Sequence, residues 1–82
     1  MNRLLKLPEV LIVTGLKKSA VYSKLKDGTF PQSIQLGTRC VAWPSQDVAA
    51  WVDAAVAGFS DSELRTLVSR LHQQRAELRQ AA

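Results

Sequence analysis

Two glycines, Gly15 and Gly28, bracket a stretch that has the period of a short helix. Glycine readily adopts a positive φ and therefore often follows the last turn of a helix. Gly15 is expected to end one helix, for which Pro8 suits the first turn, and a second helical pattern starts within about three residues, the spacing of a helix-turn-helix. Asp27 and Gly28 supply the signal that ends the second helix. The sequence therefore predicts two short helices joined by a tight turn.

The second helix of this pair has two different faces. Val21 and Leu25 lie four residues apart and share one face. The opposite face carries hydroxyl groups, one cation and one aromatic ring, on Ser19, Tyr22, Ser23 and Lys26. Such a face suits a polyanion whose edges can be read, and it predicts contact with duplex DNA in the major groove.

Lys17 and Lys18 stand at the start of the same helix. A cation there opposes the helix dipole, and neither side chain can cap the helix as Ser or Asp would. We expect such a local cost where two ammonium groups reach the phosphates of a nucleic acid. In the alternative interpretation Ser19 is the N-cap and both lysines are simply solvated.

The positive charge of the chain is concentrated in its first half. The 82 residues carry a formal net charge of +4. Residues 1–43 hold seven Lys and Arg against two acidic residues, whereas residues 44–82 hold four basic and five acidic residues. The excess coincides with the predicted helix-turn-helix, as expected for a nucleic-acid-binding face. The alternative is ordinary surface charge.

Composition argues against several other classes of protein. One cysteine, Cys40, and one histidine, His72, cannot form an internal disulfide or a metal site, and we expect no cofactor. The lone cysteine indicates a reducing, cytoplasmic compartment. We find no run that suits a signal peptide or a membrane span. No paired carboxylates or Gly-rich phosphate loop predict an enzyme, and His72 is expected to be an ordinary surface residue.

A two-stranded hairpin is predicted directly after the helix pair. Residues 33–36 and 39–43 are short runs with strand-like alternation, and Gly37 and Thr38 separate them. A hairpin in this position is a wing, and Arg39 next to its tip is placed to enter a minor groove or to bind a phosphate. In the alternative interpretation Arg39 forms a surface ion pair with one of two carboxylates, Asp27 or Asp47.

Two further helices are predicted in the second half of the chain. Ser45 is the expected cap of the first, and both Trp43 and Trp51 are assigned to the core because the apolar period places them inward. The apolar stripe of this helix consists of Val48, Trp51, Val52 and Ala55. Ser60 and Glu63 then form a capping box at the start of the final helix.

We divide the chain into a domain of residues 1–57 and a helical extension of residues 58–82. One stripe of the final helix carries Leu64, Leu67, Leu71 and Leu78. This stripe either packs back on the domain or pairs with a second copy of the chain. Self-association is favoured, because a domain of about 55 residues already has its own core and a trailing apolar helix would otherwise stay partly exposed.

The predicted fold class is mainly α with a small β-hairpin, a winged helix-turn-helix followed by a C-terminal helix. Several segments resemble the AlpA family of prophage and mobile-element regulators, whose winged helix is similar to the MerR and excisionase folds. These segments are residues 4–10, 14–22, 28–31, 36–39 and 41–43, and the resemblance covers about residues 3–53. The resemblance implies DNA binding through the helix that carries Lys18, Ser19, Tyr22, Ser23 and Lys26, with Arg39 in the wing.

The predicted function is that of a sequence-specific, double-stranded DNA-binding transcriptional regulator. The candidate DNA-binding residues are Lys17, Lys18, Ser19, Tyr22, Ser23, Lys26, Thr38 and Arg39. An alternative is an excisionase, which would use the same contacts to bend attachment-site DNA and recruit an integrase. A third hypothesis is a protein-interaction module that uses the last helix. The expected partners are double-stranded DNA and either an integrase or RNA polymerase, with no membrane contact.

Overall fold

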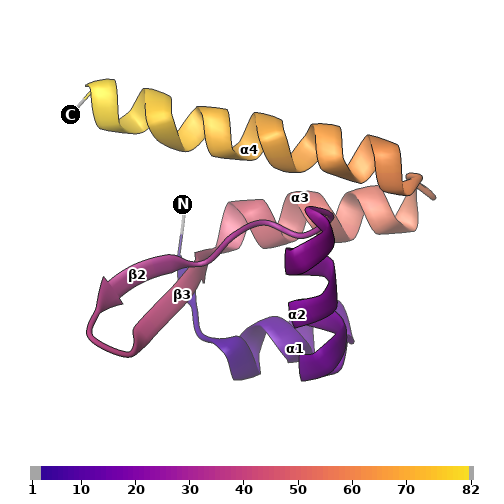
Figure 1. The fold of residues 1–82 in the computed structure, drawn as a ribbon, viewed down its shortest axis with the longest axis horizontal. Helices are drawn as coiled ribbons and strands as arrows, with labels where there is room; N and C mark the ends of the chain where they lie inside the picture. The colour runs from indigo at the N-terminus through magenta and orange to yellow at the C-terminus, as the bar shows by residue number, and fades with distance from the viewer. Residues whose placement is uncertain (1–2, 82) are drawn as a thin grey trace.

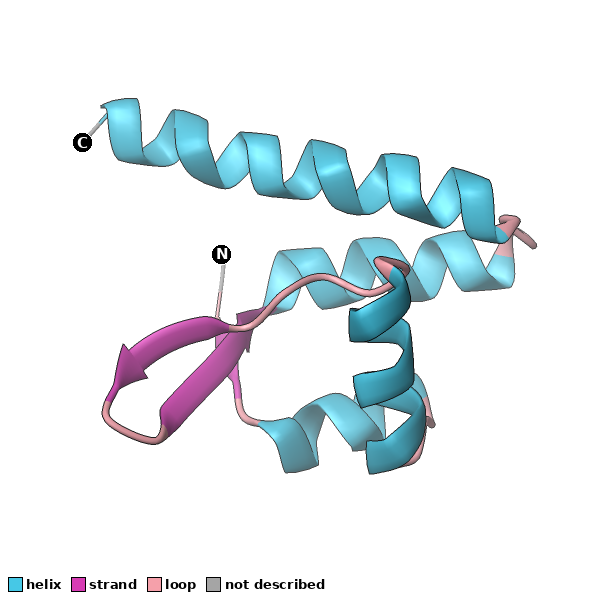
Figure 2. Ribbon diagram, viewed as in Figure 1, coloured by secondary structure: helices cyan, strands magenta, loops and turns pink. Residues whose placement is uncertain are grey.

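The computed structural model describes residues 3–81. The fold is mainly helical and contains one small sheet (Figures 1 and 2). The elements are β1 (Leu4–Leu5), α1 (Leu7–Thr14), α2 (Lys18–Asp27), β2 (Ile34–Gly37), β3 (Cys40–Pro44), α3 (Ser45–Val56) and α4 (Asp61–Ala81). The mainly helical class and the β2–β3 hairpin are confirmed.

A glycine follows the last turn of both α1 and α2, and a lysine precedes α2. Gly15 and Gly28 have φ values of 71° and 80°, and each lies directly after the last turn of its helix. The N–H of Gly15 donates to the carbonyl oxygen of Leu11 at 2.9 Å, which closes α1. Lys17 precedes α2 with an extended backbone, and Ser19 lies inside the helix. The alternative in which Ser19 caps α2 is therefore wrong.

The sheet has three strands rather than the two of the predicted hairpin. Its order is β1-β3-β2, and both pairings are antiparallel. Leu4 and Leu5 form β1, in which Leu4 faces Pro44 and Leu5 faces Trp43. A two-residue strand has almost no signal of its own, because its pairing partner lies some forty residues later in the chain.

An aromatic cluster lies at the centre of the core. Phe30, Trp43 and Trp51 are all buried, and the ring of Phe30 meets the two indoles edge to face at centroid distances of 6.4 and 5.1 Å. Each indole also donates a hydrogen bond of 2.8 Å from Nε1, Trp43 to the carbonyl oxygen of Pro31 and Trp51 to that of Thr29. The assignment of both tryptophans to the core is confirmed.

The start of α3 differs from the expected cap. Ser45 is the first helical residue and Pro44 precedes it, so Ser45 is not the N-cap. Its Oγ instead accepts a hydrogen bond of 2.6 Å from the backbone N–H of Arg3, and its own N–H donates to the carbonyl oxygen of Arg3. Ser45 thus extends the pairing of β1 into α3. Further along, Ala54 is buried in place of the predicted Ala55, which is exposed.

The long helix α4 turns back along α3 and continues over the sheet (Figure 1). The predicted capping box is confirmed, because Ser60 N donates to Glu63 Oε1 at 3.1 Å and Glu63 N donates to Ser60 Oγ at 3.3 Å. Four apolar side chains of α4 are buried, and three of them join the aromatic core; the four are Leu64, Leu67, Val68 and Leu71. The apolar core therefore extends across the predicted boundary at residue 57.

This packing changes the expectation for self-association. Leu64, Leu67 and Leu71 are buried against the chain's own core, so they are not available to a second copy. The argument for self-association assumed that the first 57 residues fill their core without help, whereas a domain of that size buries little apolar surface and these three leucines add to its core. Leu78 alone of the four stays exposed, with 66 % of its surface accessible.

Leu67→Ala and Leu78→Ala form a matched pair that tests whether residues 58–82 are an appendage. Truncation of a buried leucine costs about 2–4 kcal/mol of unfolding free energy, whereas truncation of an exposed one costs less than about 0.5 kcal/mol. We expect Leu67→Ala to destabilise the whole chain in urea denaturation monitored by tryptophan fluorescence, which reports on the core of the first 57 residues. An unchanged unfolding transition in Leu67→Ala would show that the core of the first 57 residues does not depend on α4.

Candidate nucleic-acid interface

The outward face of α2 is exposed along its whole length. Val21 is fully buried and Leu25 is partly buried against the core, so the apolar face of the helix points inward as predicted. All six candidate residues on and before α2 are exposed: Lys17, Lys18, Ser19, Tyr22, Ser23 and Lys26. Half of the Tyr22 surface is accessible. The structure thus brings these hydroxyl, aromatic and ammonium groups together on one accessible face.

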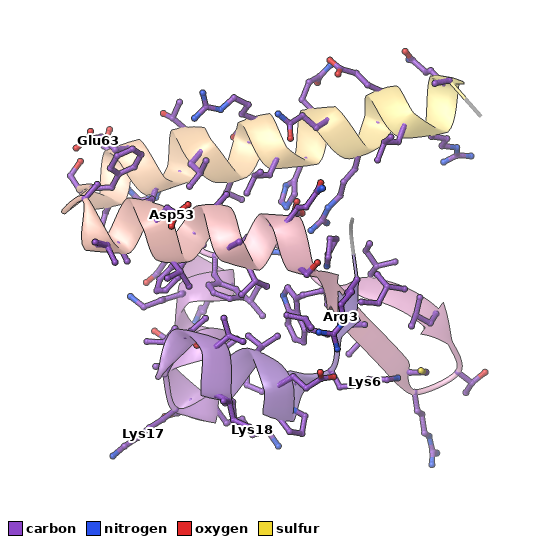
Figure 3. All side chains as sticks on the ribbon, turned by 180° about the vertical axis from the view of Figure 1, so that it is seen from behind. Arg3, Lys6, Lys17, Lys18, Asp53 and Glu63 are labelled. Carbon is purple, nitrogen blue, oxygen red and sulfur yellow. The ribbon has the colours of Figure 1, made fainter. Side chains whose placement is uncertain are left out.

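The beginning of α2 concentrates positive charge. Lys17 is the N-cap residue of α2 and Lys18 is its first helical residue, and no side-chain hydrogen bond caps the helix there. Their side chains extend from the molecule away from α4 (Figure 3). The positive end of a helix dipole and its free N–H groups favour an anion, and two ammonium groups add to that preference. Lys18 Nζ also lies 6.0 Å from the centroid of the Tyr22 ring, at the outer limit of a cation–π contact.

The last turn of α2 is held by main-chain contacts. The N–H of Gly28 donates to the carbonyl oxygen of Leu25, and the N–H of Thr29 donates to that of Lys24 at 2.9 Å. Lys24 and Lys26 lie near this end, where a cation interacts favourably with the helix dipole. Lys26 therefore contributes positive charge to the outward face without a cost to the helix.

The turn of the β2–β3 hairpin presents Thr38 and Arg39 to solvent. Both side chains are exposed, and Arg39 adopts a φ of 61°, a left-handed conformation that is uncommon for a residue other than glycine. Arg39 is thus part of the turn and not of the strand predicted over residues 39–43. Within residues 3–81 the ion pairs are Arg3–Glu9 and Arg75–Asp47, so the alternative in which Arg39 pairs with Asp27 or Asp47 is wrong.

Lys6 is a further candidate for the nucleic-acid interface, and sequence reasoning missed it. It lies between β1 and α1, and its Nζ donates to Cys40 Sγ at 2.7 Å, at the start of β3 next to the hairpin turn. Its side chain extends from the segment just before α1 toward the hairpin (Figure 3). Lys6 was counted only as part of the charge of the first half, because the pairing of β1 with β3 that brings it to Cys40 is a long-range contact. The charge excess ahead of α1 was the one signal that could have found it.

Two hollows of the surface lie away from this cationic face. One of about 350 Å³ lies between the second half of α4 and the sheet, and includes Leu4, Ile34 and Leu78 in its lining. Another of similar volume lies between α3 and α4. In the part of the chain that the structure describes, no three His, Cys, Asp or Glu side chains are grouped to hold a metal ion, and no helix has the length and apolar character that a membrane crossing requires.

Comparison with known proteins gives a family match over most of the chain. The family model described as prophage CP4-57 regulatory protein (AlpA) matches residues 3–56. The chain is 39 % identical over 57 residues to the uncharacterized protein ORF88 of Enterobacteria phage P4, a match that covers 70 % of this chain and 65 % of that protein. It is 32 % identical over 56 residues to the DNA-binding transcriptional activator AlpA of Escherichia coli K12, covering 61 % of this chain and 80 % of that protein. No solved structure matches significantly.

Arg39→Gly and Arg39→Ala test whether the left-handed backbone at Arg39 lowers the free energy of unfolding. Both variants remove the charge, but only glycine adopts the left-handed conformation without a steric cost, which is about 1 kcal/mol for other residues. We expect Arg39→Gly to be more stable than Arg39→Ala by up to about 1 kcal/mol in urea denaturation. A glycine variant less stable than the alanine variant would show that the turn is not strained at this position.

Proposed function

Because the chain belongs to the AlpA family, we propose that it is a sequence-specific, double-stranded DNA-binding transcriptional regulator of a prophage or mobile element. The family consists of transcriptional regulators and not of enzymes. The observation that carries the proposal is the exposed face of α2, on which cations, hydroxyl groups and one aromatic ring lie together. In this proposal α1, α2 and the β2–β3 hairpin act as a winged helix-turn-helix, and the chain works in the cytoplasm, where it meets its DNA.

The residues of the face divide into two roles by chemistry. The ammonium groups of Lys17, Lys18 and Lys26 neutralise phosphates, which positions the protein but carries no sequence information. Ser19, Tyr22 and Ser23 meet base edges in the major groove, since their side chains lie on the outward face of α2 between the lysines.

The hairpin supplies the second group of contacts. Thr38 and Arg39 lie at its exposed turn, and a guanidinium group there is suited to a phosphate or to a narrow minor groove. Arg39 makes no ion pair with the described residues, so its charge is available to DNA.

The proposal is tested first by selecting bound duplexes from a random DNA pool. We expect one enriched sequence, and its symmetry would report how copies of the chain are arranged, since palindromic half-sites indicate a two-fold dimer and direct repeats a head-to-tail array. A strong bend induced at tandem sites next to a recombination site would favour the excisionase alternative. Failure to enrich any sequence would contradict sequence-specific binding.

The salt dependence of binding to the selected duplex tests the electrostatic part of the proposal. Four cations on phosphates, Lys17, Lys18, Lys26 and Arg39, give a slope of log K against log salt of about −3 to −4 per monomer. Lys18→Gln and Lys26→Gln should each reduce the magnitude of that slope by about one.

Arg79→Gln is the matched control, because Arg79 is an exposed cation in the last turn of α4, far along the chain from the proposed face. It should leave the slope unchanged. A slope near zero for the parent protein, or an equal effect of Arg79→Gln, would refute the assignment of α2 to DNA. Unchanged activity in Lys26→Glu and Arg39→Glu would instead support the protein-interaction hypothesis.

A further inference from the structure

Residues 28–33 join α2 to β2, and they fix where the hairpin lies relative to the proposed recognition helix. Two anchors of this linker come from the part of the chain that the family model matches. Trp51 Nε1 donates to the carbonyl oxygen of Thr29, and Trp43 Nε1 donates to that of Pro31, both at 2.8 Å. Side chains therefore hold the main chain of the linker at two neighbouring points.

A second set of anchors comes from α4, which lies outside the matched residues. Arg65 Nε donates to the carbonyl oxygen of Asp27 at 3.0 Å, at the C-terminal end of α2. Arg75 Nη2 donates to the carbonyl oxygen of Gln32 at 2.8 Å, just before β2. The N–H of the same Gln32 donates to His72 Nε2 at 3.1 Å. The contacts of α4 thus fall at the two ends of the linker, on either side of the two indole contacts.

Charge and protonation keep these side chains in place. Arg75 Nε and Nη2 lie 2.9 and 2.6 Å from Asp47 Oδ2, and Asp47 is buried. This ion pair holds the guanidinium group in the position from which it donates to the linker. His72 can accept a hydrogen bond at Nε2 only when that nitrogen carries no proton. Burial, and then the positive charge of Arg75, lower the pKa of His72, while Asp47 acts in the opposite direction. The net effect lowers the pKa of His72 and favours the neutral imidazole that the contact with Gln32 needs.

We propose that Arg65, His72 and Arg75, the clasp residues, make α4 a positioning element that fixes the β2–β3 hairpin relative to α2. In this proposal the clasp residues act through the linker and not through contacts with DNA, since α4 lies on the side of the molecule opposite the start of α2 (Figure 1). Their effect on DNA binding rests on the proposed function, whereas their effect on the geometry of the chain does not.

The clasp is tested by the distance between α2 and the hairpin turn. Spin labels on Ser23→Cys and Thr38→Cys, in a Cys40→Ser background, report this distance by pulsed electron resonance. We expect a single narrow distribution for the parent and a clearly broader one for the Arg65→Ala/His72→Ala double variant. Arg75 is left in place, because its removal would leave Asp47 as a buried unpaired charge and destabilise the fold.

Arg70→Ala/Gln73→Ala is the matched control, since both residues are exposed on the same helix and have no hydrogen bond to the linker among the described contacts. It should keep the narrow distribution of the parent. The Arg65→Ala and His72→Ala single variants, which each keep two clasp residues, should broaden it less than the double variant does. Equal distributions in the double variant and the control, both folded by circular dichroism, would overturn the proposal.

DNA binding provides a second readout that separates this inference from the proposed function. In a hydroxyl-radical footprint on the selected duplex, the double variant should lose protection at the edge contacted by the hairpin and keep the protection given by α2. Its affinity should fall by about 5- to 20-fold, as expected for two hydrogen bonds that no longer hold the linker. An unchanged footprint with intact affinity would contradict the clasp, whereas absence of DNA binding in the parent would contradict the proposed function and leave the distance measurement to decide the clasp.

Discussion

The indole N–H groups of Trp43 and Trp51 hold the stretch of main chain on which both halves of the candidate interface depend. They donate to the buried carbonyl oxygens of Pro31 and Thr29 in the linker between α2 and β2, while their rings pack around Phe30. Edge-to-face aromatic pairs contribute about 0.5–1.5 kcal/mol beyond their area burial, and a buried carbonyl left without a donor costs about 1–3 kcal/mol. Each tryptophan therefore links the stability of the core to the position of the hairpin.

Much of this fold was predictable because its signals are local. Gly15 and Gly28 end their helices with positive φ, and Ser60 and Glu63 form the capping box, as the sequence indicated. The outward face of α2 was also predictable, since a period of 3.6 residues separates Val21 and Leu25 from the polar side chains. These features depend on residues that lie within four positions of one another.

The features that sequence reasoning missed depend on contacts between distant residues. Strand β1 exists because Leu5 meets Trp43, and Lys6 reaches the hairpin only as a result of that pairing. His72 was taken for a surface residue, but it accepts a hydrogen bond from Gln32, 40 positions earlier. Helical periodicity identified the apolar stripe of α4, yet it contains no information on whether the stripe meets the chain's own core or a second copy.

The two halves of the chain differ in charge and in what they contribute to the proposed interface. The cationic first half presents α2 and the hairpin turn, where two lysines oppose the helix dipole and Arg39 takes a left-handed backbone, so local stability is reduced where the proposed contacts are. The second half supplies α3 and α4, whose buried apolar side chains join the core and whose Arg75–Asp47 pair links the two helices. The proposed contacts therefore lie on the surface of the first half, whereas residues of both halves form the core.

Backbone amide shifts measured by NMR during titration with the selected duplex test the central claim most directly. The account predicts that the largest changes fall on residues 17–26 and on the hairpin turn at 37–40, and that the outward residues of α4, among them Ser69 and Ala76, do not change. Largest changes on α4, with residues 17–26 unaffected, would contradict it.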